Sequence, residues 1–171
     1  IGSGCMTELL CVHKYLVHKK PILLSAAQAS TIPVVYCTVE LGLNELGRLL
    51  PGENVLIHAG AGGVGLAAIQ YAQRVGANVI ATASESKHDF LRSLGVHHIT
   101  TSRDGAAFVR ELSAIVQNIG KINVVLNCLI DEYIPGSLDQ MAPGGRFLEI
   151  GKRGIWSKEK MSAYRPDVAY H

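Results

Sequence analysis

A glycine-rich segment near residue 60 has the residue types and the spacing of a nucleotide-binding turn. Gly60, Gly62 and Gly65 form the pattern Gly-x-Gly-x-x-Gly, and they follow an apolar run over residues 55–57 that predicts a buried strand. In such a turn the first glycine makes the tight turn, the second lets the backbone approach a pyrophosphate, and the third lets the next helix pack on the strand. The spacing therefore predicts a site for a dinucleotide cofactor.

The residues after the glycines predict the helix that such a site requires. Apolar side chains recur at the spacing of one helix face before Gly76 ends the pattern, namely Val64, Ala67, Ala68, Tyr71, Ala72 and Val75. A helix start favours an anion because its N–H groups lack partners and its dipole is positive there. We therefore expect the phosphates to bind at this turn, which includes Ala61, Gly63 and Val64. The alternative, a flexible surface loop, does not explain the flanking strand and helix.

The end of the next strand indicates which nicotinamide cofactor would bind. The strand predicted over residues 78–83 ends at Ser84, near the position where an NAD-binding protein has an acidic residue for the ribose 2′-hydroxyl. Because Ser84 is uncharged and Lys87 follows it, the site can accept a 2′-phosphate, and NADPH is expected rather than NADH. Glu85 would repel that phosphate if its side chain pointed inward. Alternatively, Ser84 caps the next helix and Lys87 lies on its solvated face.

Composition and charge describe one globular α/β unit and exclude some classes of partner. The chain has 171 residues, 48% of them hydrophobic, with 18 glycines and a net charge of +2. Such a chain can bury a sizeable core. Because the basic residues are scattered, we expect no nucleic-acid partner. The sequence predicts no membrane span and no signal peptide, and it begins in mid-pattern, as if cut from a longer chain.

The cysteines and histidines do not indicate a metal site. Cys5, Cys11, Cys37 and Cys128 are isolated from one another and from any histidine at metal-ligand spacing, so no metal is expected. Isolated thiols fit a reducing, cytoplasmic compartment, where they serve as small buried apolar groups. His58 lies in a predicted central strand, and we expect it to be a hydrogen-bonded core residue rather than a catalyst.

Helical and extended segments alternate along the rest of the chain. Extended segments are predicted at residues 97–100, 122–129, 146–150 and 168–170, and helical segments at 85–94, 106–117 and 135–140. A turn at residues 143–145 is expected before the segment at 146–150. This alternation predicts a mostly parallel sheet with right-handed crossovers and helices on both faces, the Rossmann-type doubly wound α/β fold.

The first fifty residues follow a different plan. We expect an extended piece over residues 7–15, a loop over 21–24, and Ser25 as the cap of a short helix over 26–29. A longer helix over 33–49 then leads into the nucleotide fold. This layout suggests the tail of a preceding domain and a helical connection.

Several motifs together resemble one protein family. They are Ile-Pro-Val-Val-Tyr at 32–36, Leu-Pro-Gly-Glu-Asn-Val-Leu-Ile-His at 50–58, Ala-Gly-Gly-Val-Gly at 61–65, Ser-Arg-Asp at 102–104, Val-Val-Leu-Asn at 124–127, and Ala-Pro-Gly-Gly-Arg-Phe-Leu-Glu-Ile-Gly-Lys at 142–152. The chain resembles the medium-chain dehydrogenase/reductases, and within them the zinc-independent enoylreductase domains of polyketide synthases and animal-type fatty acid synthases. The resemblance implies that residues 1–24 end a substrate-binding, GroES-like domain and that 25–171 form an NADPH-binding Rossmann domain truncated at its C-terminus.

The resemblance also implies a reaction. These domains reduce a 2-enoyl thioester on an acyl carrier protein, beside neighbouring synthase domains, with hydride from NADPH going to the β-carbon and a proton to the α-carbon. Lys152 follows Gly151 at the end of a predicted strand and matches the lysine that is this family's candidate proton donor or enolate stabiliser. An ammonium can fill either role. A solvated lysine at a strand end is the alternative.

Further cofactor contacts are implied residue by residue. Asn127, Cys128 and Leu129 resemble the segment beside the nicotinamide and its ribose, and Thr38 resembles a residue near the nicotinamide amide. Ser102 and Arg103 resemble a loop on the adenine side, where an arginine can meet the 2′-phosphate or stack on the base. The corresponding alternatives are a turn-forming asparagine, an ordinary helix threonine and a surface loop.

Two departures from the family keep other functions open. Leu41 stands where many members have a tyrosine associated with α-carbon protonation, and Glu40 should face away from it in a helix. An aspartate suspected to partner the lysine would lie beyond His171, so the isolated fragment is expected to be incomplete for catalysis. One alternative is a stand-alone NADPH quinone or enone reductase. The other is a non-catalytic nucleotide-binding module.

Overall fold

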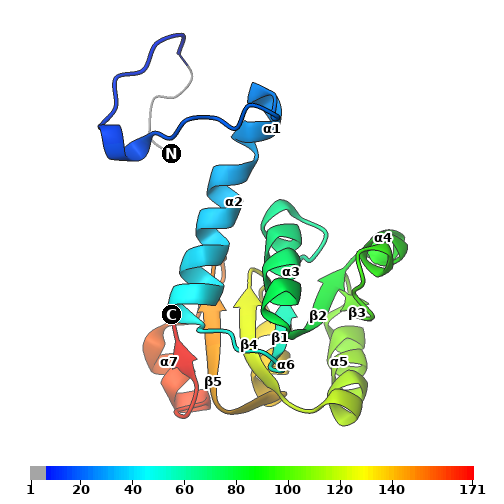
Figure 1. The fold of residues 1–171 in the computed structure, drawn as a ribbon. Helices are drawn as coiled ribbons and strands as arrows, with labels where there is room; N and C mark the ends of the chain where they lie inside the picture. The colour runs from blue at the N-terminus through cyan, green and yellow to red at the C-terminus, as the bar shows by residue number, and fades with distance from the viewer. Residues whose placement is uncertain (1–6) are drawn as a thin grey trace.

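The computed structural model describes residues 7–171 and centres on one parallel sheet. Its six strands have the order β3-β2-β1-β4-β5-β6, and every neighbouring pair is parallel. The strands are β1 (Asn54–Ile57), β2 (Asn78–Ala83), β3 (His98–Thr101), β4 (Ile122–Asn127), β5 (Met141–Glu149) and β6 (Ala169–Tyr170). The predicted Rossmann-type fold is confirmed, and the chain crosses the sheet between β3 and β4, so that β1 and β4 are neighbours at its centre (Figure 1).

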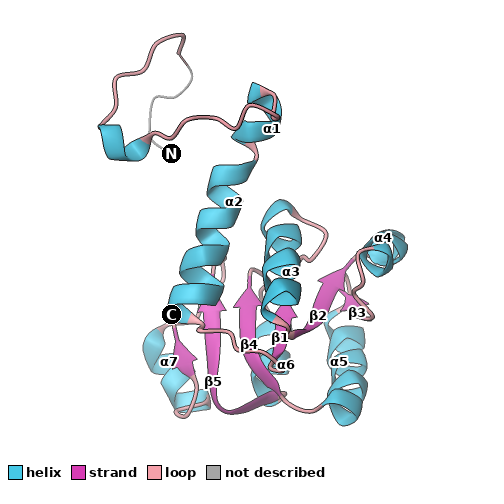
Figure 2. Ribbon diagram, viewed as in Figure 1, coloured by secondary structure: helices cyan, strands magenta, loops and turns pink. Residues whose placement is uncertain are grey.

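Helices cover both faces of the sheet, as Figure 2 shows. On one face lie α2 (Ile32–Val39), α3 (Gly63–Val75) and α4 (His88–Ser93); on the other lie α5 (Gly105–Ile119), α6 (Tyr133–Asp139) and α7 (Lys158–Tyr164). Successive strand residues point to opposite faces. Val55 and Ile57 therefore join the core under α3, whereas Leu56 joins the core under α5. The sequence did not predict α7.

The helices of the core begin and end where the sequence supplies caps. Helix α3 ends at Gly76, whose φ of 86° is in the left-handed region that glycine adopts without a Cβ clash. Helix α5 begins at Asp104, whose carboxylate accepts a hydrogen bond from the Ala107 N–H at 2.9 Å.

Three predicted segments differ from the structure in detail. The helix expected over 33–49 is α2 followed by a π-helical turn, η2 (Glu40–Leu46), closed by a Gly47 N–H to Gly42 O bond of 2.7 Å. Gly47 permits this wide turn, because a Cβ there would lie 2.9 Å from the same carbonyl. The helix expected over 85–94 starts as a 3-10 turn, η3 (Glu85–Lys87), before α4. The strand expected over 122–129 ends at Asn127.

The turn expected at residues 143–145 was wrong. These residues lie inside β5, which starts at Met141 and shifts its register against β4 between Ile122 and Val124. Gly144 has a φ of 72°, and a glycine in this conformation lets a strand absorb extra residues as a bulge rather than ending.

Residues 7–31 form an arm that projects away from the sheet (Figure 1). None of them is buried, and Leu9 and Leu23 are 90% and 95% exposed. The extended piece expected over 7–15 gives way to the 3-10 turn η1 (Lys14–Leu16), whereas the short helix α1 (Ala26–Ser30) has the expected Ser25 cap. Ser25 and Gln28 complete a reciprocal capping box.

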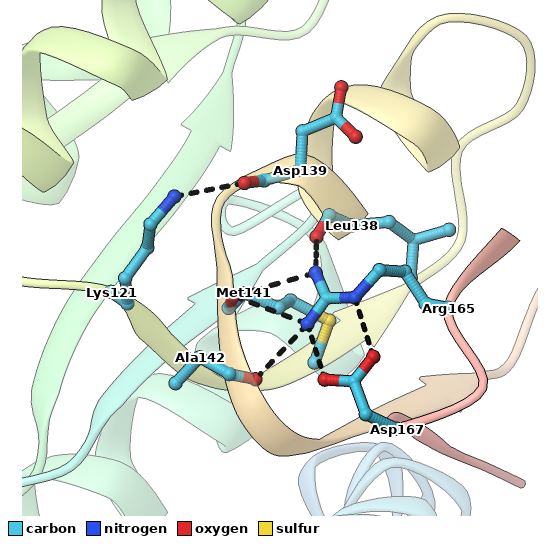
Figure 3. Close-up of polar contacts among 7 residues, drawn as sticks. All are labelled: Lys121, Leu138, Asp139, Met141, Ala142, Arg165 and Asp167. Atoms are coloured by element: carbon cyan, nitrogen blue, oxygen red, sulfur yellow. Dashed lines mark hydrogen bonds and ion pairs between the residues drawn. The ribbon is translucent and has the colours of Figure 1, made fainter.

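Arg165 fastens the edge of the sheet opposite the strand carboxyl ends. Its guanidinium donates to the carbonyl oxygens of Leu138, Met141 and Ala142 and pairs with Asp167 at 2.8 Å (Figure 3). The α6–β5 connection is thus tied to the α7–β6 connection. No helix among residues 7–171 has the length and apolar character needed to cross a bilayer.

Candidate functional site

The glycine turn lies at the carboxyl end of β1 and leads into an uncapped helix. Gly62 is the N-cap of α3 in an extended conformation, and no side chain among the described residues caps this helix start. The Gly62 N–H is itself bonded to Ala59 O at 2.8 Å. The N–H groups of Gly63, Val64 and Gly65, in the first turn of α3, have no backbone acceptor among the described residues and can bind an anion.

The glycines are required for reasons that differ in part from those predicted. A Cβ on Gly65 would lie 2.6 Å from Gly60 O, so only glycine lets α3 approach the turn this closely, as expected. The left-handed residue of the turn is Ala59, with a φ of 51°, and not Gly60. Gly60 is required by packing instead, because a Cβ there would lie 2.8 Å from the Ala81 Cβ of β2.

The end of β2 carries the residues expected to select the cofactor. Ser84 is half-buried and precedes η3, but its side chain makes no capping bond and lies 3.3 Å from Ser86 Oγ. Lys87 is exposed and forms no ion pair with any of residues 7–171. Glu85 lines a separate depression together with Asp104 and Glu111.

A pocket of about 440 Å³ joins the ends of β3, β4 and β5. Four of the predicted site residues line it together, namely Ser102, Cys128, Leu129 and Lys152. Burial, and next the charge of Glu149, raise the pKa of the Cys128 thiol, so that this group stays a neutral thiol. The pocket thus combines the cations Lys152 and Arg153 and the carboxylate of Asp131 with apolar and neutral groups.

Other predicted residues lie outside this lining. Arg103 is exposed, and its backbone N–H donates to Thr101 Oγ1 at 3.1 Å. Thr38 is half-buried in α2, where its hydroxyl donates to Val34 O at 2.8 Å. A larger hollow of about 660 Å³ lies along α2 and α3, beside Tyr36, Gln70 and Arg74, and contains none of the predicted residues.

A buried polar network connects the ends of β1, β4 and β5. Asn127 Nδ2 donates to Leu129 O at 2.9 Å and to Glu149 Oε2 at 2.6 Å. Its Oδ1 accepts from the Leu129 N–H at 3.2 Å and lies 2.6 Å from His58 Nδ1. The amide is therefore fully used: both of its donors and both of its acceptor sites have protein partners.

The same network reaches the strand end that carries Lys152. Glu149 Oε1 accepts from the Gly151 N–H at 2.6 Å. A Cβ on Gly151 would lie 2.7 Å from that carboxylate oxygen, so glycine is needed at this position. Glu149 was not among the predicted site residues, although its place two residues before Gly151 at the end of a predicted strand could have indicated it.

The sequence also missed Tyr133, Ile130, Asp131 and Arg153, which complete the lining of the pocket. Tyr133 packs against Phe108 with ring centroids 4.8 Å apart, and its buried hydroxyl has no hydrogen-bond partner among the described residues. Periodicity could not reveal it, since it begins α6 immediately after the irregular segment that follows β4.

Comparison with known proteins places the chain in a family. The family model described as zinc-binding dehydrogenase matches residues 63–168. The chain belongs to this family. The predicted membership in the medium-chain dehydrogenase/reductases, on the branch of polyketide synthase enoylreductase domains, is confirmed by the relatives below. No group of three or more His, Cys, Asp or Glu side chains within residues 7–171 could hold a metal ion.

The relatives of this chain include polyketide synthases and enoyl reductases. The spectinabilin polyketide synthase system protein NorB of Streptomyces orinoci is 40% identical over 99% of this chain and 8% of its own length. The CurK enoyl reductase has a TM-score of 0.83 and 51% identity over 88% of this chain and 45% of its own. The nucleotide-binding subdomain of the PpsC enoylreductase domain from Mycobacterium tuberculosis has a TM-score of 0.70 and 38% identity, covering 80% of this chain and 77% of its own.

An oxidoreductase of another kind is also similar. The quinone oxidoreductase from Thermus thermophilus, whose structure was solved with NADPH, has a TM-score of 0.72 and 30% identity over 88% of this chain and 47% of its own. The chain therefore spans a small part of the curated synthase it matches and less than half of two of these solved structures.

Proposed function

We propose that this chain is the nucleotide-binding part of an NADPH-dependent enoyl reductase that acts on 2-enoyl thioesters of an acyl carrier protein. It would work in the cytoplasm beside the other domains of a polyketide synthase. The observation that carries the proposal is the alignment of an uncapped α3, a glycine turn and Lys152 along one edge of the sheet, at the carboxyl ends of the strands. Ligands bind at this edge, near the strand reversal, in open α/β sheets. The likeness to the CurK enoyl reductase supports the substrate class.

The residues present fit a dinucleotide. The first N–H groups of α3 would bind the pyrophosphate. Because Gly65 and Gly60 have no Cβ, the helix and the strands can lie close enough together to form this site. Asn127, Cys128, Leu129 and Gly151 would border the nicotinamide end, with Thr38 near its amide, while Ser102 and Arg103 would border the adenine end. When bound, NADPH supplies the hydride for the β-carbon.

Lys152 would serve the enolate that hydride addition creates. This residue lines the pocket with Cys128 and Leu129. There it would neutralise the developing negative charge and can give a proton to the α-carbon. No tyrosine assists it at position 41, where Leu41 is 58% exposed on η2.

The preceding domain belongs to the proposal as well. We infer that residues 1–24 end a substrate-binding domain and that 25–171 form the nucleotide-binding domain. The apolar side chains of the arm, among them Leu9, Tyr15 and Leu23, are exposed here and would find cover in such a domain.

Parallel titration with NADPH and NADH, followed by nucleotide fluorescence, tests the cofactor. Tighter binding of NADPH is expected. Lys87→Ala should weaken the binding of NADPH without affecting the binding of NADH, because only NADPH has the 2′-phosphate. Lys158→Ala removes an exposed lysine on α7 and is the matched control. Equal affinity for both nucleotides in the unaltered protein would refute the assignment to NADPH.

Turnover by the full-length protein tests the substrate. It should reduce a crotonyl thioester of a carrier protein far faster than a quinone. Faster reduction of quinones would indicate a stand-alone quinone or enone reductase. NADPH binding without turnover of either substrate would indicate a non-catalytic nucleotide-binding module.

A further inference from the structure

Asn127 cannot use its side chain to hold a ligand while its present bonds persist. Each of its donors and acceptors already has a partner in His58, Leu129 or Glu149. Any effect of Asn127 on the site must therefore act through the groups that its side chain holds in place. It holds the turn at Leu129 on one side and the carboxylate that fixes Gly151 on the other.

We propose that His58, Asn127 and Glu149 are positioning residues, which lock the ends of β4 and β5 at a fixed separation so that the pocket wall at residues 128–129 faces Lys152. The inference rests on the proposed reductase function, because its consequence is the placement of the nicotinamide and the ammonium. None of the three side chains lines the pocket, and none is a catalytic residue.

The hydrogen bonds of these three residues form one chain that leads toward Lys152. His58 lies beyond the end of β1, Asn127 ends β4 and Glu149 ends β5, so the hydrogen bonds run across three neighbouring strands at their carboxyl ends. Gly151, which Glu149 clamps, is followed directly by Lys152. A change at His58 is therefore transmitted to the backbone beside Lys152 through only two other side chains.

Burial makes full pairing of this network necessary, so its side chains are held in one arrangement. Buried polar groups cost free energy that an apolar side chain in the same place would not, unless all of them are paired. His58, Asn127 and Ser137 are all buried at this edge. Ser137 Oγ lies 3.3 Å from His58 Nε2 and supports the ring from α6.

A similar asparagine network at the opposite edge supplies a control. The buried Asn54 donates to the carbonyls of Ile119, Gly120 and Lys121 and accepts from Asn78 at 3.0 Å. It ties strands together in the same manner but lies at the start of β1, away from the pocket. Asn54→Asp should therefore reduce stability and leave turnover unchanged.

The experiment compares variants of the full-length protein with NADPH and a crotonyl thioester of its carrier protein. His58→Leu removes the donor to Asn127, whereas His58→Asn keeps a nitrogen at the position of Nδ1. Glu149→Gln replaces one acceptor oxygen by a donor that would face Asn127 or Gly151. For each variant kcat, KM, the unfolding temperature and the fluorescence yield of bound NADPH are measured.

We expect kcat to fall by about 10²-fold in His58→Leu and Glu149→Gln, since a displacement of about 1 Å at the reacting atoms costs that much. His58→Asn should recover most of the loss. The affinity for NADPH should change little, because the phosphates bind at α3, whereas the fluorescence yield should fall as the nicotinamide loses its fixed surroundings.

The proposal is overturned if His58→Leu and Glu149→Gln lose no more kcat than Asn54→Asp at an equal loss of unfolding temperature. It is also overturned if His58→Asn is as impaired as His58→Leu. An unaltered protein that binds NADPH but does not reduce the thioester would instead refute the proposed function, and with it this role. The behaviour of the unaltered protein therefore separates the two failures.

Discussion

His58 Nδ1 lies 2.6 Å from Asn127 Oδ1, and both side chains are buried where β1 and β4 end. The orientation of Asn127 is fixed by the acceptors around its nitrogen, Leu129 O and Glu149 Oε2. An oxygen therefore faces the histidine, and Nδ1 must carry a proton. His58 is thus the neutral Nδ1–H tautomer, and its Nε2 lies 3.3 Å from Ser137 Oγ, whose own proton is donated to Tyr133 O.

The pH dependence of stability should reveal this histidine. Burial lowers the pKa of His58 from 6.5 to about 4, although the hydrogen bond to Asn127 opposes the shift. Between these values the unfolded chain binds a proton that the folded chain does not, so stability falls as the pH falls from about 6.5 to about 4. The free energy of unfolding should decrease by about 3 kcal/mol over this range.

Urea unfolding at a series of pH values measures this decrease. In His58→Asn, which cannot titrate, the decrease attributed to the imidazole should vanish while the rest of the pH profile stays. An unchanged slope between pH 6.5 and 4 in that variant would assign the effect to other groups.

The sequence predicted the sheet well because its strands are short apolar runs bounded by glycine or capping residues. Val55 to Ile57 and Val124 to Leu126 are fully buried at the centre of the sheet, as their composition indicates. The errors fall where tertiary packing determines the backbone. Pro143-Gly144-Gly145 has the composition of a turn, yet it lies inside β5 as a bulge, because Met141 before it and Arg146 after it both pair with β4.

The site was predicted in part for a related reason. The ends of parallel strands meet at one edge, so Leu129 and Lys152 could be expected to lie together, and they share one pocket. Ser102, which the resemblance put on the adenine side, lines the same pocket. Tyr133 was missed because its packing partner Phe108 is distant in sequence, and Glu149 because its bond to Asn127 joins two different strands. Only the fold shows that one carboxylate oxygen of Glu149 accepts a hydrogen bond from the Asn127 amide and the other accepts one from the Gly151 N–H.

Gly65 should be intolerant of any side chain. Gly65→Ala would place a Cβ within 2.6 Å of Gly60 O, so α3 must move away from the turn. We expect a loss of about 1–3 kcal/mol in stability from this overpacking. Titration with NADPH should show a larger loss in the free energy of binding, because the helix start that would bind the phosphates is displaced.

Gly42→Ala is the matched control for this substitution. A Cβ on Gly42 would meet only Leu126 Cδ1, at 3.6 Å, which is an ordinary contact. Stability and nucleotide affinity should therefore stay near those of the unaltered chain. Equal behaviour of the two alanine variants would contradict the role given to Gly65.

Arg165 should contribute more to stability than other surface arginines. Arg165→Met would leave the carbonyls of Leu138 and Ala142 without their charged donor, as Figure 3 shows. Hydrogen bonds to charged groups predict a loss of about 2–3 kcal/mol in the free energy of unfolding. Arg92→Met breaks only an exposed pair with Asp89, which is 97% exposed, and should cost less than about 0.5 kcal/mol. Urea unfolding of both variants provides the comparison, and similar losses would show that the Arg165 cluster is no more than a surface pair.

Substitution of Lys152 should separate charge stabilisation from proton donation. In the full-length protein, Lys152→Ala should lower kcat with a crotonyl thioester by about 10²–10⁴-fold if the ammonium is the proton donor. Lys152→Arg keeps the positive charge but holds its proton too tightly to give it up. Recovery of kcat in the arginine variant would therefore assign the lysine to enolate stabilisation. Persistent loss, together with a larger solvent isotope effect, would assign it to proton transfer.

Arg153→Ala removes a neighbouring charge that lines the same pocket and should affect kcat much less. An equal loss in that variant would mean that the positive charge of the pocket as a whole, and not Lys152, serves the reaction.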